Sequence, residues 1–165
     1  GRFWPLADPR RVALSGERVV ALSCEAESCR VLELGDTVIE LGVGDGAGDL
    51  GFHEGRLWWG LPALNTDGAP GRVLSEDGDQ LEGRPGDHLG RSLGGGYAAG
   101  SVNGLLAPRM LRIVPLATGD EFGVDRISGS LGVQLETVGD ALVVGVPGWV
   151  EAGGAVLVVV QEEGS

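Results

Sequence analysis

The sequence predicts an all-β fold, and three observations lead to this prediction. Short apolar blocks recur along the chain and are bounded by Gly, Pro, Asp or Asn, as strands are bounded by turns. No window of a dozen residues keeps a helical period without a Gly or a Pro. The 31 glycines and 8 prolines are offset by 42% apolar residues, which is enough to build a core. We therefore expect a turn-rich chain with almost no helix.

The expected strands, in chain order, are the blocks 18–22, 30–34, 37–41, 56–61, 111–116, 141–146 and 155–160. Several are apolar at consecutive positions, which indicates strands that are buried on both faces, as in stacked sheets. Since side chains alternate along a strand, we expect Trp58 and Trp59 to point to opposite faces of their sheet, each against a neighbouring sheet. The alternative for this pair is an aromatic platform that binds sugars.

A Gly-Asp motif recurs and divides the chain into units. The stretches 46–62, 84–108 and 117–147 each open on this motif, continue with an apolar residue and Gly, and end in an apolar strand with Pro, and 6–23 is a degraded copy. The Asp residues that open the units are Asp8, Asp49, Asp87 and Asp120. Their period, roughly 40 residues, fits one four-stranded propeller blade per unit. We predict a single domain, 1–165, built as a β-propeller-like array of about four short blades.

The two ends of the chain bear on how such an array closes. Residues 1–16 supply strands with nothing before them, and the C-terminal block supplies a strand with nothing after it. Residues 1–16 are therefore expected to complete the C-terminal blade and to give a closed four-bladed ring. The alternatives are a segment of a larger propeller, or several copies that assemble into one.

The segment "GDEFG", followed by "ALVVGVPGWVEAGGAVLVVV", resembles the FG-GAP repeat of integrin α-subunit β-propellers and of related bacterial surface proteins. In that family Phe-Gly is followed by an apolar strand that Gly-Ala-Pro closes. The resemblance extends over about 46–160, and its best-matched copy has the motif residues Gly119, Asp120, Phe122, Gly123, Gly145 and Pro147. It implies that Phe122 fills the space between adjacent blades. The family's Asp-rich calcium loop has no full counterpart here.

The charge balance limits the classes of partner. Formal net charge is −12, with 24 acidic residues against 12 basic ones, and all the basic residues are Arg. Such a surface repels nucleic-acid phosphates and anionic lipids, so neither is expected as a partner. The longest purely apolar run, 155–160, is far shorter than the roughly 20 residues of a membrane helix, and no membrane insertion is expected.

Cys24 and Cys29 flank a polar turn, "EAES", between two apolar runs. If the runs pair as a hairpin, the two sulfurs face each other, and we favour a disulfide over two free thiols or a metal site. A disulfide indicates an oxidising compartment, hence an extracellular, cell-surface or periplasmic protein.

Candidate residues for chemistry are few. His53 and His88 occur singly, no Ser lies in a Gly-x-Ser-x-Gly elbow, and no catalytic residue or cofactor is predicted. The acidic turns favour an ordinary structural role over calcium binding, for which the oxygen ligands would be Asp45, Asp49, Asp77 and Asp79.

These observations favour a non-enzymatic, extracytoplasmic structural or protein-interaction module whose partner is another protein or itself. Two alternatives stay open. The first is a carbohydrate- or calcium-dependent adhesion module that uses the acidic turns, Trp4 or Trp149. The second is a propeller hydrolase, which needs a His and carboxylates that converge at one end of the pore.

Overall fold

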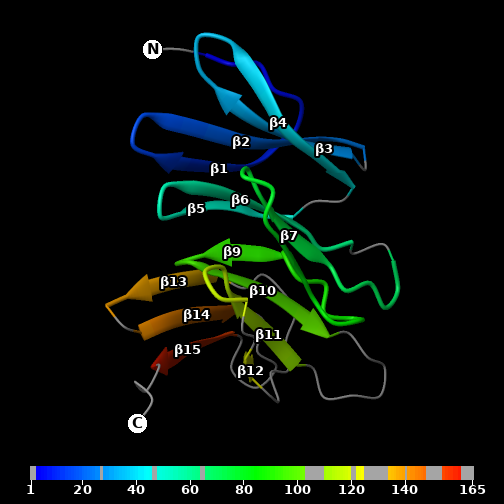
Figure 1. The fold of residues 1–165 in the computed structure, drawn as a ribbon, viewed down its shortest axis with the longest axis vertical. Coiled ribbons are helices and arrows are strands. Elements are labelled where there is room, and N and C mark those ends of the chain that lie inside the picture. The colour runs from blue at the N-terminus through cyan, green and yellow to red at the C-terminus, as the bar shows by residue number, and fades with distance from the viewer. Residues whose placement is uncertain are drawn as a thin grey trace.

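The computed structural model describes residues 3–26, 28–45, 48–63, 66–102, 110–119, 122–124, 134–139, 141–147 and 154–160. Within these ranges the chain forms fifteen strands and no helix, which confirms the all-β prediction. The strands make four small antiparallel sheets, each built from one continuous stretch of sequence. Figure 1 shows the first three sheets following one another along the long axis of the molecule, with β13–β15 beside the third sheet, at the end away from β1–β4.

The first two sheets each have four strands, in chain order across the sheet. The first sheet consists of β1 (Pro9–Ser15), β2 (Arg18–Glu25), β3 (Ser28–Leu34) and β4 (Val38–Asp45). The second sheet consists of β5 (Leu50–His53), β6 (Arg56–Leu61), β7 (Arg72–Ser75) and β8 (Gln80–Glu82).

The third sheet repeats this pattern, and the fourth has three described strands. The third consists of β9 (Ser92–Gly94), β10 (Tyr97–Val102), β11 (Met110–Pro115) and β12 (Phe122–Val124). The fourth consists of β13 (Gln134–Val138), β14 (Ala141–Pro147) and β15 (Gly154–Val160).

Tight turns join the first two strands of the sheets. In the third sheet Gly95 and Gly96 separate β9 from β10, and their φ angles are 55° and 82°. Two successive left-handed residues match the twist of a two-residue hairpin, and glycine adopts them without steric cost. Turns of this kind account for part of the glycine-rich composition.

The sheets begin at Pro9, Leu50, Ser92 and Gln134, so the interval between the starts of successive sheets is nearly constant. The structure therefore has a more regular period than the Asp residues used to find it. Asp8 and Asp49 directly precede the first strand of a sheet, but Asp87 lies further from the start of β9. The stretch 117–147 does not form one sheet, because β12 belongs to the third sheet and β13 to the fourth. The Gly-Asp pair at 48–49 therefore precedes the first strand of a sheet, whereas the pair at 119–120 precedes the last strand of a sheet.

Both faces of the inner sheets are buried, as the consecutive apolar positions predicted. Trp59 packs with Val20, Leu22 and Val31 of the first sheet. Trp58, its neighbour on β6, packs instead with Leu93 and other residues of the third sheet. A further cluster joins the third sheet to the fourth through Ala99, Leu111, Ile113, Leu135, Leu142 and Val144. The prediction that the two Trp rings point to opposite faces is confirmed.

The first strands of the four sheets contact one another in succession: β1 with β5, β5 with β9, and β9 with β13. The described strands do not close into a ring, and the first and fourth sheets lie at opposite ends of the molecule (Figure 1). Strand β1 pairs with β2 inside the first sheet, and β15 pairs with β14. Residues 9–15 therefore extend the first sheet and not the last one, unlike the expectation for residues 1–16.

Candidate functional site

Asp49, a predicted calcium ligand, lies where three sheets meet. Its Oδ1 accepts hydrogen bonds at 3.0 Å from Arg11 Nε of β1 and from the backbone N–H of Leu50. Its Oδ2 accepts one at 3.1 Å from the N–H of Leu93 on β9. Donors from the first, second and third sheets thus surround this carboxylate. These three hydrogen bonds link the first, second and third sheets at Asp49.

The other predicted calcium ligands lie apart from Asp49. Asp77 and Asp79, in and after the β7–β8 turn, both form ion pairs with Arg56 of β6, at 2.7 Å from Asp77 Oδ2 to Arg56 Nε. Asp45 ends β4, and its side chain lies outside the described residues. Within the described part of the chain no group of three or more His, Cys, Asp or Glu is placed to hold a metal ion.

His88 and Asp87 are buried, and no local sequence pattern indicates their roles. His88 Nδ1 lies 3.0 Å from the carbonyl oxygen of Pro62, and the His88 backbone has a φ of 48°. Asp87 accepts a hydrogen bond at 2.8 Å from the N–H of Arg84 and lies 3.5 Å from Arg112 Nε. Both residues fasten the loop before β9, so His88 has a structural role. His53 is partly exposed, in the β5–β6 hairpin.

Cys24 and Cys29 form a disulfide, as predicted. They are directly opposite each other in the ladder between β2 and β3, with a Cα–Cα distance of 4.0 Å. Both are buried in the core between the first and second sheets. The bridge closes the hairpin at its turn.

The motif residues of the FG-GAP resemblance lie on the third and fourth sheets. Gly119 has a φ of 72° in the turn before β12, and Asp120 lies outside the described residues. Phe122 and Gly123 pair with Ile113 and Arg112 of β11, but the side chain of Phe122 is outside the described part, so its core role stays a prediction. Gly145 and Pro147 lie on β14.

Arg18 of β2 joins the first sheet to the second through two carboxylates. Its Nε donates at 2.9 Å to Glu33 of β3, and its Nη2 donates at 2.7 Å to Glu76 in the β7–β8 turn. Glu76 also accepts the N–H of Leu57 at 2.9 Å. Hydrogen bonding from Arg18 lowers the pKa of Glu76 below its ordinary value, against an opposing effect of burial. Hydrogen bonds from Glu76 and Glu33 raise the pKa of Arg18.

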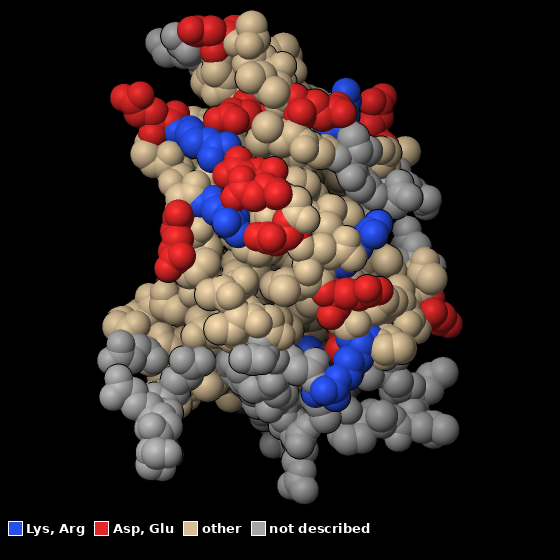
Figure 2. All heavy atoms as spheres, in the orientation of Figure 1, with Lys and Arg blue, Asp and Glu red and all other residues tan. Residues whose placement is uncertain are grey.

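Acidic and basic side chains are interspersed on the face of the molecule seen in Figure 2, and the red carboxylates outnumber the blue guanidinium groups there. Several Arg residues of the described chain form ion pairs with carboxylates: Arg10 with Asp8, Arg11 with Asp49, Arg18 with Glu33 and Glu76, and Arg56 with Asp77 and Asp79. The pairs made by Arg11 with Asp49 and by Arg18 with Glu76 link the first sheet to the second.

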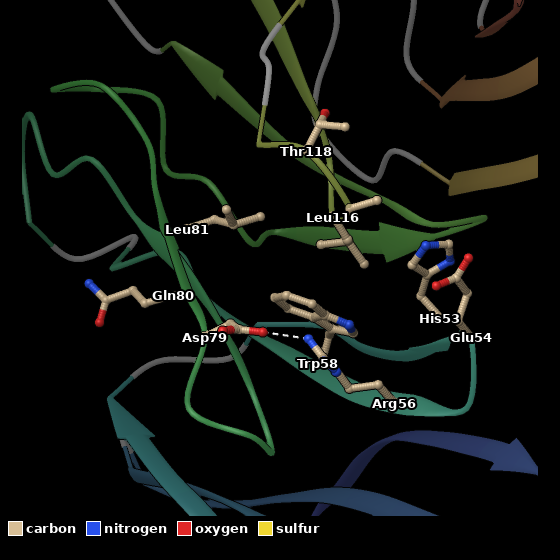
Figure 3. Close-up of a pocket in the computed structure, with 10 residues that line it drawn as sticks. His53, Glu54, Arg56, Trp58, Asp79, Gln80, Leu81, Leu116 and Thr118 are labelled. Carbon is tan, nitrogen blue, oxygen red and sulfur yellow. Dashed lines mark hydrogen bonds and ion pairs between the residues drawn. The ribbon is translucent and has the colours of Figure 1, made fainter.

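A cavity of about 510 Å³ opens between the second sheet and the chain that follows β11. The polar part of its wall includes His53, Glu54, Arg56 and Asp79, and the apolar part includes Leu81 and Leu116. Figure 3 shows His53 and Glu54 at one side, and Leu81 and Leu116 across from Arg56. The cavity therefore combines hydrogen-bonding groups with an apolar surface.

Trp58 forms part of the wall of this cavity. The Arg56 guanidinium lies over its ring, 5.8 Å from the centroid, and Leu116 lies on the other side of the ring in Figure 3. Its Nε1 has no hydrogen-bond partner in the described structure and lies at the end of the indole nearer His53 and Glu54 (Figure 3). A buried indole N–H usually finds an acceptor, so this donor is a feature that the fold alone does not explain.

The outer face of the fourth sheet is apolar and exposed. Val156, Val158 and Val160 are 68, 62 and 62% exposed, and Val138 is 67% exposed. Strand pairing puts these residues on one face with Ala141, Val143 and Gly145. We call this set of seven residues the valine face. The opposite face of the same sheet, with Leu135, Leu142 and Val144, is buried against the third sheet.

The outer face of the first sheet is partly covered by the chain that precedes β1. Trp4 and Leu6 pack on Ala21, Leu32 and Leu34. Trp4 Nε1 donates a hydrogen bond to the carbonyl oxygen of Gly35 at 3.1 Å, which holds the ring in place. Trp4 is thus a packing residue at this end, whereas Trp149 lies outside the described residues.

Among the described residues there is no helix, and hence none with the length and apolar character needed to cross a bilayer. A scan of the sequence against protein-family models finds no match, and a search of curated proteins finds none either. The resemblance to the FG-GAP repeat therefore rests on the sequence motifs themselves.

Proposed function

We propose that the chain is a non-enzymatic, extracytoplasmic structural or protein-interaction module of the FG-GAP propeller type. The observation that carries this proposal is the succession of contacts between the first strands β1, β5, β9 and β13 of four consecutive sheets. Blades in a propeller are consecutive antiparallel sheets arranged around a channel, which makes the same strand of each blade adjacent to that of the next. The nearly constant interval between the starts of successive sheets supports the same arrangement.

Three further features support the proposal. The Cys24–Cys29 disulfide favours an oxidising compartment, because cytosolic reductants keep most thiols reduced. Two carboxylates of the acidic turns, Asp49 and Asp79, form ion pairs with Arg side chains. The valine face supplies an exposed apolar surface of the kind that marks a protein interface.

Photo-crosslinking in cells that express the chain tests this function. A photoreactive residue replaces Val156 on the valine face, and the matched control replaces Glu82, which is exposed at the end of β8. We expect a covalent protein adduct from position 156 and none from position 82. Adducts from neither position, or equal adducts from both, contradict an interaction module that works through this face.

Carbohydrate binding is a second candidate, and the cavity beside Trp58 favours it. A hydroxyl group both accepts and donates hydrogen bonds, so it can pair with an indole N–H and with a carboxylate such as Glu54 at once. A sugar ring adds an apolar C–H surface for Leu81 and Leu116.

The indole N–H resonances of ¹⁵N-labelled protein test this candidate in a titration with D-glucose and D-galactose. Binding shifts the Trp58 resonance, identified by its loss in Trp58→Phe, in a saturable way. Trp59, on the opposite face of β6, is the matched control and stays in place. No shift, or equal shifts of both, contradicts a sugar site there.

A further inference from the structure

The cavity of about 510 Å³ is bounded by segments of the second and third sheets that contact each other. The N–H of Leu116, after β11, donates to the carbonyl oxygen of Gly96 at 2.9 Å. The His53 ring lies so close to Gly96 that a Cβ atom there would come within 2.7 Å of His53 Cε1. A Cβ atom at Gly119 would likewise lie 3.2 Å from Leu81 Cδ2. These contacts shape the cavity without any ligand.

Trp58 offers a ligand only the edge of its indole that carries the N–H. The Arg56 guanidinium lies over one face of the ring, and Leu116 lies on the other side (Figure 3). Trp58 is 4% exposed, and its Nε1 has no hydrogen-bond partner among the described residues. Figure 3 shows this nitrogen at the end of the indole nearer His53 and Glu54. A buried donor of this kind requires an acceptor, which a ligand can bring as a carbonyl oxygen.

The charged groups of the wall carry an excess of negative charge. Arg56 is shared between Asp79, on the wall, and Asp77, so one cation balances two carboxylates. Glu54 also lies on the wall, and it forms no ion pair or hydrogen bond within the described part of the chain. Figure 3 shows Glu54 beside His53. The wall therefore attracts a positively charged group and repels an anion.

The apolar part of the wall adds a third requirement. Leu81 and Leu116 lie across the cavity from Arg56 (Figure 3). Lysine and arginine combine an aliphatic stem with a cationic end, so their stems cover apolar surface while the charge stays at a polar group. In a peptide, the backbone beside such a side chain supplies the carbonyl acceptor that the Trp58 N–H lacks. One basic residue of a peptide thus matches all three features of the cavity.

We infer that this cavity receives a basic side chain, lysine or arginine, from a protein partner. The cationic end lies at Glu54, the stem lies against Leu81 and Leu116, and an adjacent peptide carbonyl oxygen accepts the Trp58 N–H. This inference rests on the proposed interaction function and names the chemistry of the partner. The net charge of −12 supports it, because an acidic surface attracts basic partners and accelerates their association.

Titration of ¹⁵N-labelled protein with short peptides tests the inference. The probes are the N-acetylated peptide amides Gly-Lys-Gly and Gly-Arg-Gly, and the matched control is Gly-Lys-Gly with its side-chain ammonium acetylated and thus uncharged. Both basic peptides are expected to shift the indole N–H resonance of Trp58 in a saturable way, while that of Trp59, on the opposite face of β6, stays in place. The acetylated peptide is expected to bind about threefold more weakly or less.

Two variants separate the cavity from the general acidity of the surface. Glu54→Gln removes a carboxylate from the wall without breaking a described ion pair, and it is expected to weaken both basic peptides about threefold or more. Glu40→Gln removes the same charge from an exposed position of the first sheet and is the matched control, which leaves binding unchanged. Added salt is expected to weaken binding to the parent, and to have less effect in Glu54→Gln.

Four outcomes overturn the inference. They are the absence of a saturable Trp58 shift with either basic peptide, equal binding of the acetylated peptide, equal loss of affinity in Glu54→Gln and Glu40→Gln, and binding of D-glucosamine without binding of the peptides. The last would mean that the cation belongs to a sugar and not to a protein.

The inference and the proposed function can fail separately. If the peptides do not bind and position 156 still gives protein adducts, the cavity is not the contact surface and the interaction function stands. If the basic peptides bind through Glu54 and position 156 gives no adduct, the cavity is supported and the valine face is not.

Discussion

Arg18 on β2 binds both carboxylate oxygens of Glu76, at 3.0 and 2.7 Å, although the two residues belong to different sheets and are 58 positions apart in the chain. The same guanidinium lies 5.3 Å from the centre of the Phe52 ring. A planar guanidinium suits such bidentate pairing, which a Lys could not reproduce. The pair therefore contributes to the alignment of the first sheet on the second.

This ion pair predicts a dependence of stability on pH. The pKa of Glu76 is lowered in the folded state, chiefly by hydrogen bonding from Arg18, so its contribution is complete above the unfolded pKa of about 4.5 and is lost as pH falls through the folded pKa. For a partly exposed pair we expect a contribution of about 1 kcal/mol. Urea unfolding at pH 7 and at successively lower pH measures it.

In Glu76→Gln the midpoint should be lower at pH 7 and should fall less steeply with acid. Glu40→Gln removes the same charge from an exposed position on β4 and is the control. Equal pH profiles for the parent and Glu76→Gln would show that the pair contributes nothing.

Gly60→Ala and Gly145→Ala should differ strongly in stability, although the two glycines have equivalent positions. Each is the fifth residue of the second strand of its sheet and lies two residues before a proline. At position 60 the new methyl group would collide with the Gly90 carbonyl, and overpacking of this kind costs about 3 kcal/mol. At position 145 the change should stay within about 0.5 kcal/mol. Chemical denaturation of both variants decides this, and equal costs would mean that the sheets pack differently.

The disulfide should be complete and stabilising. Thiol titration of the denatured, unreduced protein should find no free thiol, since Cys24 and Cys29 are bonded to each other. Reduction should destabilise the fold by about 2 kcal/mol, the chain-entropy expectation for so short a loop. Two reactive thiols in oxidised preparations would exclude the bridge and weaken the argument for an oxidising compartment.

His88→Ala should destabilise the protein, whereas His53→Ala should be nearly neutral. His88 is buried with its Nδ1 at 3.0 Å from the Pro62 oxygen, and removal of the ring leaves a cavity and an unpaired carbonyl. We expect a loss of about 2 kcal/mol from these two effects. For partly exposed His53 the change should stay within about 0.5 kcal/mol. The two urea midpoints give the comparison.

Calcium should add little to thermal stability, because Arg11 and backbone N–H groups already bind the Asp49 carboxylate, and Arg56 binds Asp77 and Asp79. A bound ion at a hundredfold excess over its Kd would stabilise the fold by about 2.7 kcal/mol. Melting curves in millimolar calcium and in chelator should therefore coincide. Asp49→Ala should lower the melting temperature equally in both solutions, and a calcium-dependent difference would identify a metal site.

The strands and the burial of both their faces could be predicted because they depend on local patterns. The run Leu57-Trp58-Trp59 is apolar at consecutive positions, and alternation along the strand sends these rings into two cores. The Cys24–Cys29 bridge likewise spans a single hairpin, so short-range spacing was sufficient to place it.

The boundaries of the sheets and the role of Asp49 could not be predicted in this way. A Gly-Asp pair precedes a first strand at positions 48–49 and a fourth strand at positions 119–120, so the pair by itself does not indicate which strand follows. The role of Asp49 depends on a hydrogen bond from the backbone N–H of Leu93, which is 44 residues later in the chain. Only the packing of one sheet on another brings these two residues together. The roles of His88 and Asp87 could not be predicted for the same reason, because Pro62 and Arg112, which they contact, are distant in the sequence.

Each sheet takes its strands from one uninterrupted stretch of chain, and successive sheets begin at nearly equal intervals. A gene segment as long as one interval therefore encodes a whole sheet, and its duplication or loss leaves every hydrogen-bonded ladder intact. During synthesis, the first sheet can form on the ribosome before the second has been translated, and each later sheet then finds a finished surface to pack against. The architecture is suited to growth and shortening by whole units, in evolution as in folding.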